Sequence, residues 1–273
     1  MVNGYTPTTL KEALEIRASQ NVVPYAGGTD LMIQGNEDAT YLFLHKIKEL
    51  TEIKEDENDI KIGAACTFTE ILANEAVPAI LKDALSKIAA PAIRNMGTIG
   101  GNIGNGSAKA DSVLIFFATD AKICLQSVRG ERVVPIKEFY QGRKKLDLAP
   151  DELIVAVWMP KTAKTEQYRY EKIGARGALA ISRVSFAALI TVDGGKITHL
   201  ATAYGAVSDV VIRRDDIDTM LIGKTVEEAK NSKQAYLKAM DEAIVPIRGR
   251  VSSEYRKSVC MNLLEDFLNQ FLK

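Results

Sequence analysis

Two glycine-rich segments carry residue types that could hold an anionic ligand. The first, AGGTD at residues 26–30, follows a short apolar stretch. A Gly-Gly pair lets the backbone turn sharply and approach a ligand closely. Successive backbone N–H groups in such a turn can form an anion-binding concavity, to which Thr29 adds a hydroxyl donor. A lone Gly-Gly pair, however, is more often only a turn.

The second segment is IRNMGTIGGNIGNGSAKAD, residues 93–111, with five glycines in nineteen residues. Two glycine loops with small hydroxyl or amide side chains suit a pyrophosphate that is held from two sides. The order G-x-G-x-x-G of the Rossmann fingerprint and the Walker A sequence are both missing. A dinucleotide that binds here would therefore require another fold.

Cysteine and histidine are too few for a metal centre of the common kinds. Three scattered cysteines, Cys66, Cys124 and Cys260, and two histidines cannot ligate an iron–sulfur cluster or build a His-rich zinc site. We therefore expect no metal site. An odd, scattered set of thiols is typical of a reduced, cytoplasmic protein.

The composition is that of an average globular protein, with 273 residues, 47% hydrophobic and 26% charged. Lys plus Arg equals Asp plus Glu at 35 each, which argues against nucleic acid or an anionic membrane surface as a partner. The longest apolar runs, residues 113–118 and 153–160, are far shorter than the roughly 18 residues that span a bilayer. The N-terminus shows no secretory signal pattern.

The elements that would position these loops can be predicted from hydrophobic spacing and turn residues. We expect residues 93–111 to be a loop and residues 113–118 to be a buried helix or strand. Capping boxes at Thr9, Thr67 and Thr225 predict helix starts, and a helix after Pro78 should end near Pro91. The last two helices should cover residues 225–243 and 253–273. The predicted strands are residues 41–45, 60–65, 121–128, 131–136, 153–159, 167–172, 182–192 and 196–207, with hairpin turns at 129–130 and 193–195.

Five segments in order resemble one protein family over nearly the whole chain. They are AGGTDL at 26–31, IRNMGTIGGNI at 93–103, Asp111, EKIGARGALAISRVS at 171–185 and SSEYRKSV at 252–259. Together they resemble the FAD-binding (medium) subunit of the molybdenum hydroxylases, the family of xanthine, carbon monoxide and nicotinate dehydrogenases.

The resemblance implies an α+β fold. Residues 1–165 would form two α/β subdomains, about 1–55 and 56–165, of the vanillyl-alcohol-oxidase (PCMH-type) FAD-binding fold. Residues 166–273 would form a C-terminal domain of antiparallel sheet and helices. A change in the local sequence pattern near residue 165 agrees with this boundary.

The resemblance also implies the FAD contacts. Gly27, Gly28 and Thr29 would meet the pyrophosphate, Asp111 the ribose or nearby polar groups, Leu148 the isoalloxazine edge and Lys172 the flavin ring. From the residues alone, Asp111 could equally be a helix cap, Leu148 a packing residue and Lys172 a solvated lysine. The full predicted set is Pro24, Tyr25, Ala26, Gly27, Gly28, Thr29, Asp30, Leu31, Thr98, Ile99, Gly100, Gly101, Asn102, Asn105, Asp111, Leu148 and Lys172.

The implied function is electron transfer within an oxidoreductase. A molybdopterin-binding large subunit would hydroxylate the substrate, and a small subunit with [2Fe–2S] clusters would pass electrons to this subunit's FAD and on to NAD⁺ or another acceptor. Two alternatives stay open: a stand-alone flavin reductase of the same broad fold, and a scaffold that has lost FAD. Flavin colour would exclude the scaffold, and co-purifying partner chains would exclude the reductase.

Overall fold

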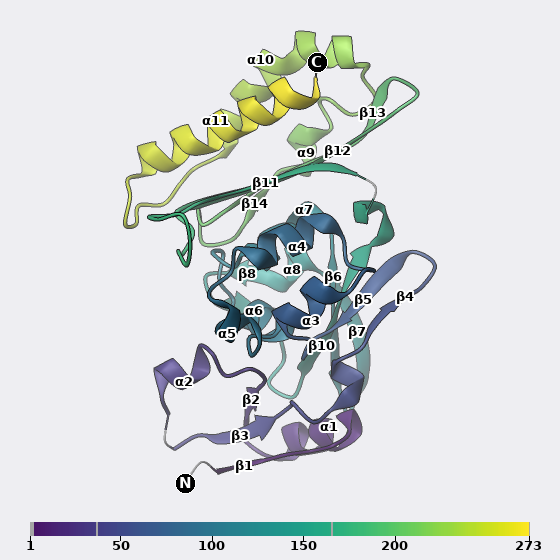
Figure 1. Ribbon diagram of the computed structural model, residues 1–273, viewed down its shortest axis with the longest axis vertical. Helices are drawn as coiled ribbons and strands as arrows, with labels where there is room; N and C mark the ends of the chain where they lie inside the picture. The colour runs from purple at the N-terminus through teal and green to yellow at the C-terminus, as the bar shows by residue number, and fades with distance from the viewer. Residues whose placement is uncertain (1–2, 37, 165, 273) are drawn as a thin grey trace. The chain divides into compact units, whose positions relative to one another are not determined.

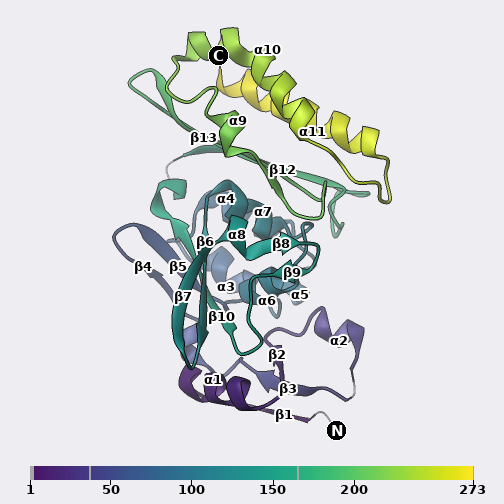
Figure 2. The same cartoon turned by 180° about the vertical axis from the view of Figure 1, so that it is seen from behind.

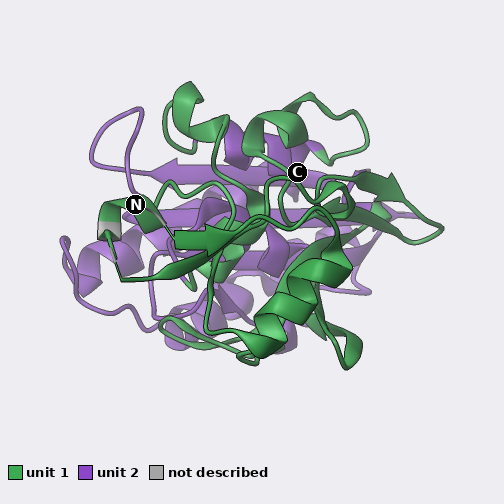
Figure 3. Cartoon of the chain, turned by 90° about the horizontal axis from the view of Figure 1, so that it is seen from below, with its two compact units in different colours: residues 1–78, 88–106, 120–161 green, residues 79–87, 107–119, 162–273 purple. Residues whose placement is uncertain are grey.

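The computed structural model describes residues 3–36, 38–164 and 166–272. The chain forms two compact units, and it passes between them repeatedly (Figure 3). The first unit holds Met1–Pro78, Ile88–Gly106 and Asp120–Lys161, and the second holds Ala79–Lys87, Ser107–Thr119 and Thr162–Lys273. The second unit therefore includes two short segments from the first half of the chain. The domain ranges predicted from the sequence stay predictions.

The first unit contains three sheets (Figure 1). A parallel sheet has the order β1-β3-β2, an antiparallel sheet the order β4-β5-β10-β6-β7, and β8 pairs with β9. The strands are β1 (Asn3–Tyr5), β2 (Val23–Tyr25), β3 (Thr40–Phe43), β4 (Ile53–Glu55), β5 (Asp59–Gly63), β6 (Lys122–Ser127), β7 (Gly130–Pro135), β8 (Tyr140–Gly142), β9 (Lys145–Leu146) and β10 (Leu153–Pro160).

The helices of the first unit are short apart from the first. They are α1 (Leu10–Ser19), α2 (Leu31–Gln34), η1 (Lys48–Leu50), α3 (Phe68–Ala73), α5 (Pro91–Arg94), α6 (Ile99–Gly104) and α8 (Ile136–Phe139). Thr9 accepts a hydrogen bond from the backbone of Glu12, and Thr67 with Glu70 forms a complete capping box, so both predicted helix starts are confirmed. A core cluster joins α1 to the sheets through buried side chains such as Leu14, Leu42 and Leu153.

The second unit places one antiparallel sheet between two layers of helices (Figures 1 and 2). Its strands β11 (Gln167–Ile173), β12 (Val184–Asp193), β13 (Lys196–Gly205) and β14 (Ile212–Arg213) pair in that order. All seven residues from 184 to 190 are buried, as expected for a strand covered on both faces. The helices are α4 (Ala79–Ser86), α7 (Asp111–Ala118), α9 (Asp215–Asp218), α10 (Val226–Ala243) and α11 (Ser253–Phe271), and η2 (Lys161–Lys164) precedes the sheet.

Two predictions for the central segment are wrong. Residues 93–111 are not a loop throughout, because α6 begins at Ile99 and is capped by Thr98, whose hydroxyl accepts from the Gly101 N–H at 3.1 Å. The helix is held by burial of Ile99 and Ile103 rather than by propensity. The helix predicted after Pro78 is α4, which ends at Ser86 rather than near Pro91. Pro91 instead begins α5, where the N–H that proline lacks would have no helical partner in any case.

The other predicted helices and strands form, with small shifts at their ends; the helix predicted over 253–273 ends at Phe271, and residue 273 lies outside the described residues. Residues 113–118 belong to the helix α7, whose eight residues are all buried. Both predicted hairpins form, with β6 paired to β7 and β12 to β13. In the described part of the chain, no helix combines the length and apolar character needed to cross a membrane.

Candidate functional site

The first glycine loop is held tightly by its neighbours. Gly28 has φ +69°, a conformation that favours glycine, and a Cβ there would overlap the Tyr25 side chain. A Cβ at Gly27 would overlap the carbonyl oxygen of Met96, so this loop packs directly on the backbone that leads to the second loop. Tyr25 itself packs edge-on against Tyr41, with ring centroids 5.6 Å apart.

The second glycine loop is the start of α6. Gly100 packs against Ala64, whose Cβ and carbonyl oxygen would lie 2.6 and 2.7 Å from an added Cβ. Gly101 is exposed, and an added Cβ would meet only the Thr98 hydroxyl, at 3.0 Å. The Asn105 side chain donates a hydrogen bond to the Asp30 carboxylate and so links the two loops. Gly100 is therefore a packing glycine, whereas the space beside the Gly101 Cα is open.

Both loops line one cavity of about 470 Å³, a size typical of ligand pockets. The cavity gathers most of the predicted residues: Pro24, Ala26, Gly27, Gly28, Thr29, Asp30, Leu31, Thr98, Gly100, Gly101, Asn102, Asn105 and Leu148. Four predicted residues are not among its lining residues: Tyr25, Ile99, Asp111 and Lys172.

The cavity also includes two cations that the sequence analysis missed. Arg17 lies in the last turn of α1, and its Nε is buried without a hydrogen-bond partner among the described residues. Burial lowers the pKa of the Arg17 guanidinium, and the charge of Asp151 opposes this shift; an arginine stays protonated nevertheless. Lys144, in the turn between β8 and β9, is the second cation. No local pattern distinguishes either residue from an ordinary surface cation.

Asp111 and Lys172 form a buried ion pair in the second unit. The Lys172 ammonium donates to Asp111 Oδ2 at 2.7 Å and to the Lys87 carbonyl oxygen at 2.8 Å. Ser182 donates to the other carboxylate oxygen of Asp111 at 2.7 Å. The Lys172 side chain is 10% exposed, so it is not a solvated lysine. Ala110, not Asp111, occupies the cap position of α7.

Comparison with known proteins identifies the family. Residues 1–162 match the model for the FAD binding domain in molybdopterin dehydrogenase, and residues 169–271 match the CO dehydrogenase flavoprotein C-terminal domain. The chain belongs to this family of molybdopterin dehydrogenase FAD subunits. It is 31% identical to the nicotinate dehydrogenase FAD-subunit of Eubacterium barkeri, with 97% of this chain and 96% of the relative covered. It is also 31% identical to the xanthine dehydrogenase FAD-binding subunit of Escherichia coli, with 96% and 93% covered.

Solved structures share the fold of this molybdopterin dehydrogenase subunit. A carbon monoxide dehydrogenase from Hydrogenophaga pseudoflava superposes with a TM-score of 0.89 at 24% identity, covering 98% of this chain and 96% of that chain. Quinoline 2-oxidoreductase from Pseudomonas putida superposes with a TM-score of 0.87 at 22% identity, covering 100% and 97%. The α+β fold, the FAD cofactor and the membership in an oxidoreductase family, all predicted from the sequence, are confirmed.

The cavity fits the cofactor of this molybdopterin dehydrogenase family. Gly101 is exposed at the cavity, and the absence of a side chain there leaves space for a ligand beside α6. The buried Nε of Arg17 is a polar donor without a protein partner among the described residues, which suits an anionic or polar ligand group. The donor set thus agrees with a dinucleotide.

Proposed function

We propose that the cavity of the first unit holds one non-covalently bound FAD per chain, with the pyrophosphate between residues 26–30 and 98–102. The observation that carries this proposal is the meeting of both glycine loops at one cavity. Backbone N–H groups of such loops are suited to phosphate oxygens. Those of residues 99–102 donate within the protein, so the first loop would supply the backbone donors. Thr29 and Asn102 add side-chain donors, and Arg17 and Lys144 add positive charge.

The chain's own residues would bind and shield the cofactor. When bound, FAD supplies a ring that exchanges electrons singly or in pairs. The apolar lining residues, which include Leu44, Leu153 and Ile154, would exclude water from part of the cofactor. Leu148 would keep its predicted place at the isoalloxazine edge. Asp111 and Lys172 stay predicted contacts, with their charges balanced by each other.

We further propose that the chain is the electron-transfer subunit of a molybdenum hydroxylase. Its partners would be a molybdopterin-binding large subunit and a small subunit with [2Fe–2S] clusters, and NAD⁺ or another acceptor would receive the electrons. The three cysteines of the sequence are too few to ligate one such cluster, so the clusters must come from another chain. All three are free thiols, which supports the reducing cytoplasm as its location.

Purification of the full chain with its co-expressed neighbours tests this function. We expect a yellow protein that releases about one FAD per chain on denaturation, together with a cluster-bearing and a molybdopterin-bearing chain. The purified chain by itself should not hydroxylate a purine or another N-heterocycle. Robust hydroxylation by the single chain, or purification of a colourless chain that takes up no FAD, would contradict the proposal.

Replacement of Arg17 by methionine tests the cationic side of the cavity. A hydrogen bond to a charged group contributes about 1.5–3 kcal/mol, so FAD affinity should fall about tenfold or more. Lys11→Met is the matched control, because Lys11 lies on the same helix with its side chain 87% exposed. Fluorescence titration with FAD measures both variants. Equal affinities of Arg17→Met and Lys11→Met would remove Arg17 from the site.

A further inference from the structure

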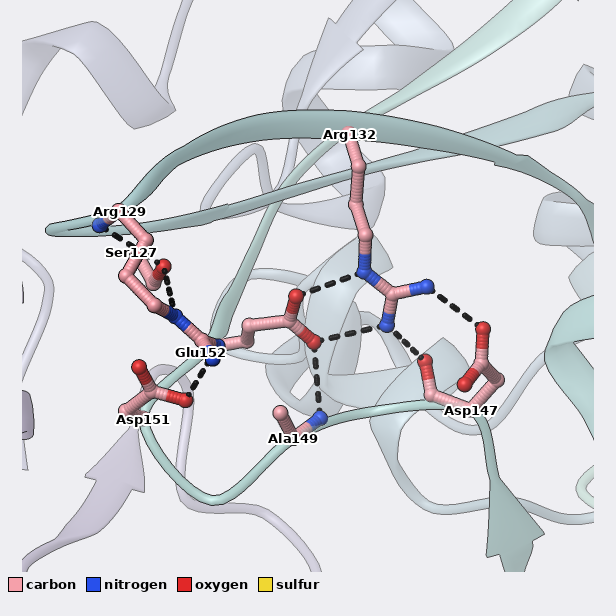
Figure 4. Close-up of polar contacts among 7 residues, drawn as sticks. All are labelled: Ser127, Arg129, Arg132, Asp147, Ala149, Asp151 and Glu152. Carbon is pink, nitrogen blue, oxygen red and sulfur yellow. Dashed lines mark hydrogen bonds and ion pairs between the residues drawn. The ribbon is translucent and has the colours of Figure 1, made fainter.

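One guanidinium on β7 holds both ends of the loop that brings Leu148 to the cavity. Arg132 donates from Nε and Nη2 to the two carboxylate oxygens of Glu152, at 2.6 and 2.8 Å (Figure 4). It also donates from Nη1 to the Asp147 carboxylate at 2.6 Å and from Nη2 to the Asp147 carbonyl oxygen at 2.8 Å. Arg132 therefore contacts the first and last residues of the loop 147–152.

The loop is closed on itself as well. Glu152 N–H donates to the Ala149 carbonyl oxygen at 3.0 Å, and Ala149 N–H donates to Glu152 Oε2 at 2.8 Å. Asp147 N–H donates to Phe139 at 2.8 Å and so anchors the start of the loop. Leu148 lies between these fixed points, which leaves its backbone little freedom.

Glu152 is the buried member of this network. It is 5% exposed, it lines the cavity, and it accepts three N–H donors. The hydrogen bonds from Arg132 are the main cause that lowers the pKa of the Glu152 carboxyl. A buried carboxylate that loses such a partner is strongly unfavourable. Without Arg132, Glu152 would have to turn toward solvent and move the cavity wall with it.

Arg132 is not itself among the residues that line the cavity. We infer that Arg132 is a positioning residue, which fixes the Leu148 loop as a preformed wall of the cofactor cavity by binding Asp147 and Glu152 together. This inference rests on the proposed function, because it takes FAD to be the occupant of the cavity. Arginine is suited to the task, since its planar fork holds two carboxylates at once, which a lysine ammonium cannot do in the same geometry.

The β6–β7 hairpin that carries Arg132 also supplies a matched control. Arg129 donates to Asp151 at 2.8 Å, but its side chain is 65% exposed and it binds neither Asp147 nor Glu152 (Figure 4). Exposed ion pairs of this kind contribute little. Arg129→Met therefore removes the same charge from the same hairpin without touching the proposed positioning contacts.

The test compares FAD affinity and local hydrogen exchange in the full chain. In Arg132→Met, amide hydrogen exchange of the 147–152 peptide should become faster. FAD affinity should fall about tenfold or more, which is the size of effect seen when residues that orient metal ligands are replaced. Arg132→Lys should also weaken FAD binding. Arg129→Met should match the wild type in both measurements. Arg132→Met/Glu152→Gln should recover part of the lost affinity, because it removes the unpaired buried charge and keeps the Ala149 hydrogen bond.

The outcomes separate this inference from the proposed function. Wild-type affinity in a folded Arg132→Met or Arg132→Lys protein would overturn the positioning role, as would failure of the double variant to recover any affinity. If Gly101→Val loses FAD while the Arg132 variants keep it, only the positioning inference fails. If Gly101→Val also binds FAD normally, the assignment of FAD to this cavity fails.

Discussion

Gly101→Val is expected to lose most FAD affinity while the chain stays folded. Gly101 is exposed at the cavity, and an added Cβ would have one neighbour within 4 Å, the Thr98 hydroxyl. The valine side chain would thus project into the space proposed for FAD rather than overlap protein atoms. Overpacking typically costs about 1–3 kcal/mol, which corresponds to roughly 5- to 150-fold in the dissociation constant. Titration of the apoprotein with FAD measures this change.

Gly100→Ala is the contrasting variant for this prediction. An added methyl group at Gly100 would press on Ala64 at 2.6 Å, so this change should lower the free energy of unfolding. Gly101→Ala, in contrast, should slightly stabilise the apoprotein, because alanine is favoured over glycine in a helix by about 1 kcal/mol. Thermal unfolding of the apoproteins gives the comparison. FAD affinity that follows stability in all three variants would contradict a direct role for Gly101.

The glycine loops could be predicted from the sequence because their signals are local. A Gly-Gly pair after a short apolar stretch marks a sharp turn wherever it occurs, and the family resemblance supplied the ligand. The same glycines are the reason that α6 was not predicted, because glycine is a poor helix former and the pattern of residues 97–106 is typical of a loop. What stabilises this helix is the burial of Ile99 and Ile103, which depends on distant segments.

The cavity cations could not be predicted for a related reason. Arg17 occupies the last turn of an amphipathic helix, where a basic residue is favourable at any exposed site. Arg17 reaches the cavity only because the fold places the end of α1 beside the glycine loops. Lys144 and Glu152 likewise reach the cavity through the turns that flank β9 and β10. Such long-range placement leaves no spacing pattern in the sequence.

Lys172→Met is expected to cause the largest loss of stability. The Lys172 ammonium ties β11 to Asp111 at the start of α7 and to Lys87 just after α4, all within the second unit. Asp111 is 5% exposed, so its carboxylate would stay buried after the loss of the ammonium, with the Ser182 hydroxyl still donating to it. Removal of one partner from a buried ion pair typically costs about 3–5 kcal/mol. Urea unfolding of the apoprotein measures the loss.

The double variant Asp111→Asn/Lys172→Met should recover much of this stability. It removes both charges, and the asparagine oxygen can still accept from Ser182, so no uncompensated charge stays buried. Lys230→Met is the surface control: its pair with Glu227 has side chains 42% and 75% exposed, and its loss should cost less than about 1 kcal/mol. A double variant no more stable than Lys172→Met would show that the ammonium acts through Lys87 rather than through the charge of Asp111. If the double variant recovers its stability, the predicted place of Lys172 beside the flavin ring can be tested in it, because both charges are then absent from a folded protein.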